Sequence, residues 1–131
     1  MTALRGNALI VEDEELIAMM LSDMLTEMGL QVCGIASTAA GAIELAEEHR
    51  PDVVLMDVQL AGKGDGVDAA TKIYQRHRIP VVFVTGSTDQ ATIDRIREDH
   101  AAAVLFKPIE AAQLRSAIER SMVRRVGAGP L

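Results

Sequence analysis

The chain is poor in cysteine, aromatic residues and long apolar segments. Its 131 residues include one cysteine and no tryptophan, and aromatic residues make up 2% of the total. Cys33 has no second cysteine to pair with, which excludes an intramolecular disulfide and favours a reducing compartment. No apolar segment approaches the roughly 20 residues of a membrane-spanning helix, and no secretory signal is evident. We therefore expect a cytoplasmic protein without a membrane-bound segment.

Basic residues are also scarce. There are 13 lysines and arginines against 19 aspartates and glutamates, and the formal net charge is −6. This balance disfavours a nucleic-acid-binding surface, which needs clustered positive charge. The one basic cluster, formed by Arg120, Arg124 and Arg125, lies where a last helix is expected to end, so it complements the helix dipole. We expect no direct contact with nucleic acid.

Apolar residues, by contrast, are abundant and grouped. They make up 49% of the chain, enough for the core of one domain. Five short runs are almost continuously apolar, and these are Ala8–Val11, Val32–Ile35, Val53–Met56, Val81–Val84 and Ala103–Phe106. Runs that do not alternate with polar residues are typical of strands covered on both faces, as in parallel sheets. Helical spacing fills each interval, so the order predicts an α/β fold with helices on both faces of a parallel sheet.

The helices can be placed from their boundaries. In the first helix, six residues form one apolar stripe that ends at Gly29, and we expect its methionines to fill the core: Ile17, Met20, Leu21, Met24, Leu25 and Met28. Three later helices are expected at about 38–49, 67–77 and 110–124. Another helix is expected to begin at a capping box between Ser87 and Gln90. Cys33 is expected to be buried. The prediction is a single domain over 1–131, with its core at about 6–124 and a flexible tail at 125–131.

Four of the five apolar runs end on a reactive polar residue. These ends carry Glu12 and Asp13, then Asp57, Thr85 and Lys107. The carboxyl ends of parallel strands share one edge of the sheet, so we expect these side chains to meet in one crevice. Like charges a few ångström apart repel by roughly 4 kcal/mol at an effective dielectric constant of 20, so three acids together need a cation. An all-oxygen set favours Mg²⁺.

The other members of this set suit phosphate chemistry. A hydroxyl from Thr85 and an ammonium from Lys107 could both hydrogen-bond phosphoryl oxygens on Asp57. A cis peptide bond between Lys107 and Pro108 would direct the amine back into the crevice. Taken alone, Asp57 is more typical of a helix or turn cap. Its coincidence with Glu12 and Asp13 favours a phosphate site.

The same motifs resemble the receiver domains of bacterial two-component response regulators. The resemblance rests on 9–13 (Leu-Ile-Val-Glu-Asp), 54–57 (Val-Leu-Met-Asp), 82–86 (Val-Phe-Val-Thr-Gly) and 105–108 (Leu-Phe-Lys-Pro), and it covers about residues 6–124. It implies a flavodoxin-like, doubly wound (βα)5 fold with strand order 2-1-3-4-5.

The resemblance also implies a function. Asp57 would accept a phosphoryl group from a phosphohistidine of a sensor histidine kinase or a histidine phosphotransfer protein. Asp13, Asp57 and the backbone carbonyl of Gln59 would bind Mg²⁺ directly, and Glu12 would act mainly through water. Thr85 and Lys107 would respond to the phosphoryl group.

The output implied by the resemblance is a contact with another protein. The face formed by the fourth helix, fifth strand and fifth helix would bind a downstream protein, and a homodimer is also compatible with it. If the chain stands alone, we expect it to signal by protein contacts or by phosphorelay rather than as an enzyme.

Two alternatives stay open. Many receivers carry an aromatic residue three positions before the lysine, and here that position is Val104. The change leaves open a phosphorylation-independent binding module. A phosphatase with an aspartyl nucleophile often has a second acid two residues after the nucleophile as a general acid. Gln59 occupies that position and argues against this enzyme.

Overall fold

The structure is a five-stranded parallel sheet between two layers of helices. The computed structural model describes residues 3–58, 60, 66–86, 90–98 and 103–127. The strands are β1 (Asn7–Val11), β2 (Gln31–Ala36), β3 (Val53–Met56), β4 (Val81–Thr85) and β5 (Ala103–Phe106). The helices are α1 (Glu15–Met28), α2 (Ala39–His49), α3 (Gly66–His77), α4 (Gln90–Glu98) and α5 (Ala111–Gly127). Strand order β2-β1-β3-β4-β5 confirms the predicted doubly wound α/β fold.

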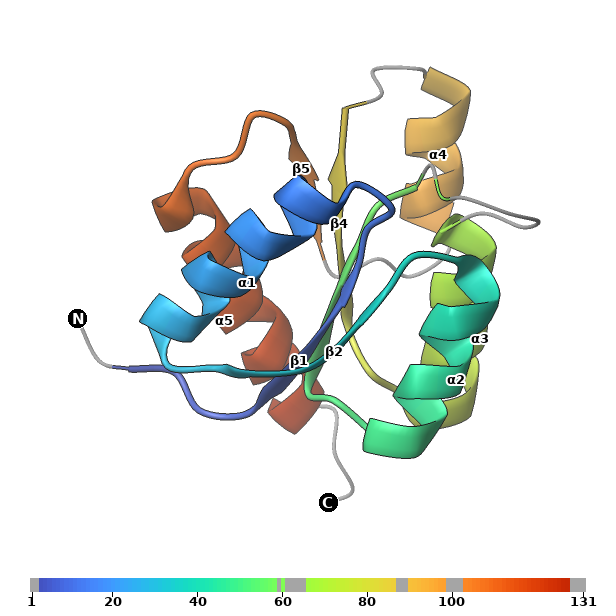
Figure 1. Ribbon diagram of the computed structural model, residues 1–131. Helices are drawn as coiled ribbons and strands as arrows, with labels where there is room; N and C mark the ends of the chain where they lie inside the picture. Colours follow the sequence, from blue (N-terminus) through green and yellow to red (C-terminus); the bar gives the residue numbers. More distant parts are fainter. Residues whose placement is uncertain (1–2, 59, 61–65, 87–89, 99–102, 128–131) are drawn as a thin grey trace.

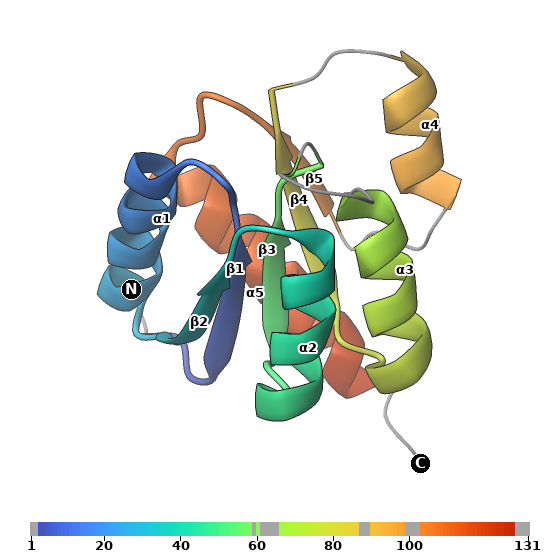
Figure 2. The ribbon, with the colours of Figure 1, turned by 45° about the vertical axis from the view of Figure 1, so that its right-hand side comes forward.

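Each face of the sheet has its own core. On one face, Leu9 and Val11 of β1 pack with apolar residues of α2 and α3 and with Ile96 of α4. On the other face, Ala8 and Ile10 pack with α1 and α5. Figures 1 and 2 show the same arrangement, with α1 and α5 on one side of the sheet and α2 and α3 on the other. Both sides of β1 are therefore buried, which explains why its sequence does not alternate.

Helix ends follow the local chemistry of the backbone. Gly29 ends α1 in the left-handed conformation, with φ of 105°, and its N–H bonds to the carbonyls of Leu25 and Thr26. This confirms the predicted C-cap. Thr38 is the N-cap of α2, where its hydroxyl accepts a hydrogen bond of 3.0 Å from the Gly41 amide. The last helix, α5, runs to Gly127, beyond the predicted end near 124. The predicted capping box before α4 includes Ser87, which lies outside the described residues.

The prediction that Met20 fills the core is wrong. The face of α1 that meets the sheet is formed by Ala18, Leu21, Leu25 and Met28. Met20 lies outside this arc and is 48% exposed. Together with Leu16, which is 81% exposed, and Met19, which is 55% exposed, it forms an apolar surface on the first two turns of the helix. We call these three residues the α1 patch.

Cys33 is less buried than predicted. It lies on β2, which is an edge strand of the sheet, and it is half-buried beside the core. Its thiol donates a 3.4 Å hydrogen bond to the Ala8 carbonyl. Burial raises the pKa of this thiol above its ordinary value.

Within the part of the chain that the structure describes, no helix has the length and apolar character to cross a bilayer.

Candidate functional site

The four strand ends chosen from the sequence meet at one edge of the sheet. β3 lies between β1 and β4, and β5 follows β4. Backbone hydrogen bonds fix the ends relative to one another, because the Asp57 amide donates to the Val11 carbonyl at 3.0 Å and the Lys107 amide donates to the Thr85 carbonyl at 2.9 Å. The parallel register therefore brings the polar residues after β1, β3 and β5, and the last residue of β4, to one site.

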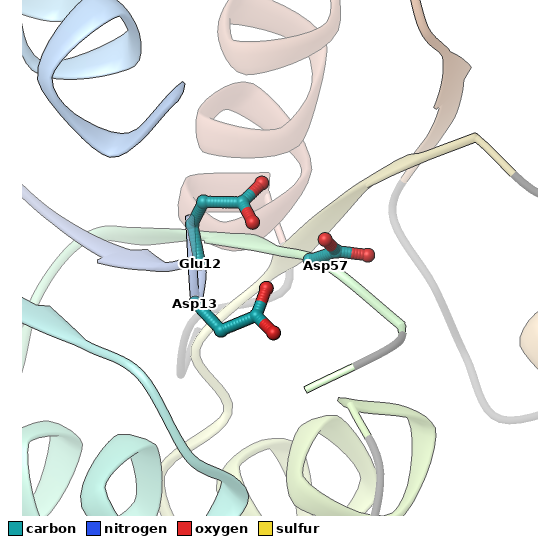
Figure 3. A group of neighbouring side chains, drawn as sticks. All are labelled: Glu12, Asp13 and Asp57. Atoms are coloured by element: carbon teal, nitrogen blue, oxygen red, sulfur yellow. The ribbon is translucent and has the colours of Figure 1, made fainter. Parts of the chain in front are cut away.

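Three carboxyl groups converge there, as Figure 3 shows. Glu12, Asp13 and Asp57 each offer one oxygen, and these oxygens all lie within 4.8 Å of one another. Glu12 is 3% exposed and Asp57 is 8% exposed, whereas Asp13 is exposed to solvent. The cluster is an all-oxygen donor set, open on the side of Asp13, and its chemistry fits a hard divalent cation such as Mg²⁺.

Lys107 links two of these acids. Its Nζ donates to Glu12 Oε1 at 3.0 Å and to Asp57 Oδ2 at 3.2 Å. Burial alone would lower the pKa of this ammonium, but the hydrogen bond to Glu12 and the charges of Asp57 and Glu12 outweigh burial, so its pKa is raised. The Lys107–Pro108 peptide bond is cis, in agreement with the expectation from the sequence. The ammonium of Lys107 thus places a positive charge between Glu12 and Asp57.

Glu12 is the most enclosed acid of the cluster. Burial raises its pKa, and the hydrogen bonds from the Glu14 amide and from Lys107 only partly offset that effect. Those two donors contact different oxygens, since Glu14 N–H reaches Oε2 at 3.2 Å and Lys107 reaches Oε1. Both carboxylate oxygens of Glu12 thus already have a protein partner.

Thr85 is the last residue of β4 and is 1% exposed. Its carbonyl holds the Lys107 amide, so the hydroxyl and the ammonium come from adjacent strand ends. Gln59, the remaining residue named as a metal ligand, lies outside the described residues.

Val104, in the position where an aromatic residue is common among receivers, is half-buried. It packs against the core cluster that contains Phe83 and Ile96. The aromatic residue of β5 is Phe106, which directly precedes Lys107 and is 45% exposed. β5 therefore presents an apolar ring to the surface, at a different position from that of many receivers.

The sequence did not single out Gly66. It is buried at the start of α3, and a methyl group on its Cα would overlap the carbonyl oxygen of Asp57. Glycine is too common a residue for its position in the sequence to reveal such a contact.

The sequence also matches a known protein family. Residues 8–119 match the family described as the response regulator receiver domain. The chain belongs to this family. It is 40% identical over 122 residues to the transcriptional regulatory protein PdtaR of Mycobacterium tuberculosis, covering 93% of the chain and 59% of PdtaR. It is 33% identical over 115 residues to the phyllosphere-induced regulator PhyR of Methylorubrum extorquens, covering 87% of the chain and 42% of PhyR.

A solved receiver domain has the same fold. The signal receiver domain of a modulated diguanylate cyclase from Desulfovibrio desulfuricans superposes with a TM-score of 0.91 at 31% identity, covering 96% of the chain and all of that domain. The two curated relatives are longer than the matched region, and the chain spans 59% and 42% of their lengths. The likeness is therefore to the receiver part of those regulators.

Proposed function

We propose that this receiver domain is a phosphorylation-dependent switch that accepts a phosphoryl group on Asp57. The observation that supports it best is the contact of Lys107 with both Asp57 and Glu12, beside the exposed Asp13. The donor is a phosphohistidine of a sensor histidine kinase or a histidine phosphotransfer protein. A carboxylate oxygen of Asp57 forms the new O–P bond as the P–N bond breaks, and the bonding electron pair stays with the imidazole.

The acidic cluster fits a Mg²⁺ cofactor. Asp13, Asp57 and the backbone carbonyl of Gln59 would hold the ion, and Glu12 would contribute through water. When bound, the ion offsets the negative charge of the phosphoryl oxygens. The protein's own contribution is to hold the Asp57 carboxylate rigidly at the end of a buried strand.

Thr85 and Lys107 would then respond to the new group. A phosphorylated side chain carries about −1.5 to −2 of charge and three strong acceptor oxygens. The Lys107 ammonium is already within hydrogen-bond reach of the accepting carboxylate. Thr85 lies at the end of the neighbouring strand β4. A change in their contacts would reach the surface formed by α4, β5 and α5.

Mass spectrometry with a small donor tests the acceptor. After incubation with Mg²⁺ and acetyl phosphate, the wild type is expected to gain one phosphoryl group and Asp57→Asn none. Asp52→Asn is a matched control, because Asp52 holds the start of β1 through the Asn7 amide at 2.8 Å and lies at the other end of β3. A wild type that stays unmodified with both acetyl phosphate and a phosphorylated histidine phosphotransfer protein would exclude the switch.

The α1 patch supports a helical phosphohistidine donor as the upstream partner. Leu16, Met19 and Met20 occupy one face of α1, which begins two residues after Asp13. A donor helix on this face would bring its phosphohistidine to the carboxyl edge of the sheet. Methionine side chains adapt well to such a contact.

The downstream partner is proposed to bind the face formed by α4, β5 and α5. β5 is the second edge strand of the sheet, and its Phe106 ring is exposed on this side of the molecule. Either a second copy of the chain or another protein could cover it. Size-exclusion chromatography with light scattering, with and without beryllofluoride, distinguishes the two occupants.

A phosphorylation-independent binding module is the second candidate, and Val104 is the observation that favours it. The switch predicts that Mg²⁺ and beryllofluoride shift the amide resonances of β5 and α5, whereas a passive module leaves them unchanged. Turnover of a phosphate monoester that is lost in Asp57→Asn would instead favour a phosphatase.

A further inference from the structure

The start of α3 lies directly on the peptide of Asp57. A Cβ atom placed on Gly66 would overlap the Asp57 carbonyl oxygen, and it would lie 3.0 Å from the Asp57 carbonyl carbon and from Met56 Cγ. Two of these three atoms belong to backbone, which cannot rotate away as a side chain does. Gly66 is not among the glycines with positive φ, so a side chain is excluded here by space rather than by backbone conformation.

The Asp57 peptide is therefore held from two sides. On the sheet side, its amide donates to the Val11 carbonyl at 3.0 Å. On the helix side, its carbonyl contacts Gly66, whose own amide donates to the Val58 carbonyl at 3.0 Å. Asp57 has little freedom between β1 and α3, and the position of its carboxylate depends on how closely α3 approaches.

We propose that Gly66 is a positioning residue for phosphoryl transfer, because its missing side chain lets α3 set the position of the Asp57 carboxylate. The inference rests on the proposed role of Asp57 as phosphoacceptor. The carboxylate must stay within reach of Lys107, now 3.2 Å away, and of the oxygens of Glu12 and Asp13. A reacting group displaced by about 1 Å can lose on the order of 100-fold in rate. Relieving the overlap at Gly66 requires a displacement of about that size.

The alternative is that Gly66 serves only the packing of α3. Val67 separates the two roles, because it follows Gly66 on the same helix, is fully buried, and belongs to the same core as Met56. Val67→Ala loosens that packing but adds no atom against Asp57. It is the matched control for a loss of stability without a displaced carboxylate.

The test compares the two variants by the rate of Asp57 labelling with acetyl phosphate. Each rate is taken at saturating Mg²⁺ and divided by the folded fraction from circular dichroism. For Gly66→Ala we expect the maximal rate to fall at least about tenfold while the half-saturating acetyl phosphate concentration changes little. For Val67→Ala the rate per folded molecule should stay close to that of the wild type.

A wild-type rate per folded Gly66→Ala molecule would overturn the inference, as would equal losses in the two variants. If Gly66→Ala folds poorly, the measurement is made in sucrose, which favours compact states. Val58→Ala gives a second packing control, because Val58 is buried in the same core and the substitution leaves in place the carbonyl that accepts the Gly66 amide. It should label at about the rate of Val67→Ala, and a loss as large as that of Gly66→Ala would count against the inference. A wild type that accepts no phosphoryl group would instead refute the proposed function.

Discussion

The ammonium of Lys107 lies 3.2 Å from the carboxylate of Asp57, although 50 residues separate them in the sequence. The same ammonium lies 3.0 Å from Glu12, so one cation serves two buried acids. In this arrangement the protein itself offsets part of the charge that a metal ion would otherwise neutralise. Any cation or phosphoryl group that enters must compete with, or displace, the contacts of Lys107.

Replacing Lys107 should therefore tighten Mg²⁺ binding. Two unit charges about 4 Å apart interact by about 1 kcal/mol in bulk water, which corresponds to roughly fivefold in an equilibrium constant. We expect Lys107→Met to lower the Mg²⁺ dissociation constant by at least that factor, measured by calorimetry. Lys72→Met, at an exposed position of α3, should leave it unchanged. Weaker binding in Lys107→Met would show that the lysine organises the acids more than it opposes the ion.

Binding of Mg²⁺ should stabilise the fold through Asp13. A ligand that binds only the folded state adds about 2.7 kcal/mol at a concentration 100 times its dissociation constant. Thermal unfolding of the wild type should therefore shift upward when Mg²⁺ replaces EDTA, and Asp13→Ala should lose most of this shift. Asp23→Ala, an exposed acid on α1, is the control and should keep it. Equal shifts in all three proteins would place the ion elsewhere.

Two positions on α1 should differ sharply in their effect on stability. Leu25 is fully buried, so Leu25→Ala should lower the free energy of unfolding by about 2–5 kcal/mol. Met20 is 48% exposed, so Met20→Ala should change it by no more than about 0.5 kcal/mol. Urea titration measures both. A large loss in Met20→Ala would mean that the α1 patch is covered in solution.

The raised pKa of Cys33 predicts a dependence of stability on alkaline pH. The thiol is favoured over the thiolate in the folded state because burial raises its pKa. Stability should be highest while the thiol is protonated, and it should fall as pH rises through the ordinary value of 9.0. Comparing urea midpoints of the wild type and Cys33→Ala across this range isolates the effect. Parallel curves for the two proteins would contradict it.

The parts of the fold that the sequence predicted are those with strong local patterns. The five apolar runs predicted the strands of the sheet. Parallel pairing of those strands then predicted that Glu12, Asp57 and Lys107 would meet, as they do. The Gly29 cap also follows from chemistry within a few residues. In each case the signal lies in residues that are neighbours along the chain, and the general geometry of parallel sheets then brings the strand ends together.

The features that were missed depend on partners distant in sequence. Met20 matched the helical stripe, but the arc of α1 that contacts the sheet excludes it. Cys33 lies in an apolar run, and the run itself does not show how far neighbouring elements cover the edge strand β2. The role of Gly66 depends on an overlap with Asp57 that only the folded chain reveals.

The distance along the chain between the site's parts has a consequence for how the protein is made. Glu12 directly follows β1, and Lys107, 95 residues later in the chain, directly follows β5. A nascent or misfolded chain lacking a docked β5 would have the acids but not their ammonium. If Asp57 is the phosphoacceptor, as proposed, the acceptance of a phosphoryl group depends on completed folding of the domain.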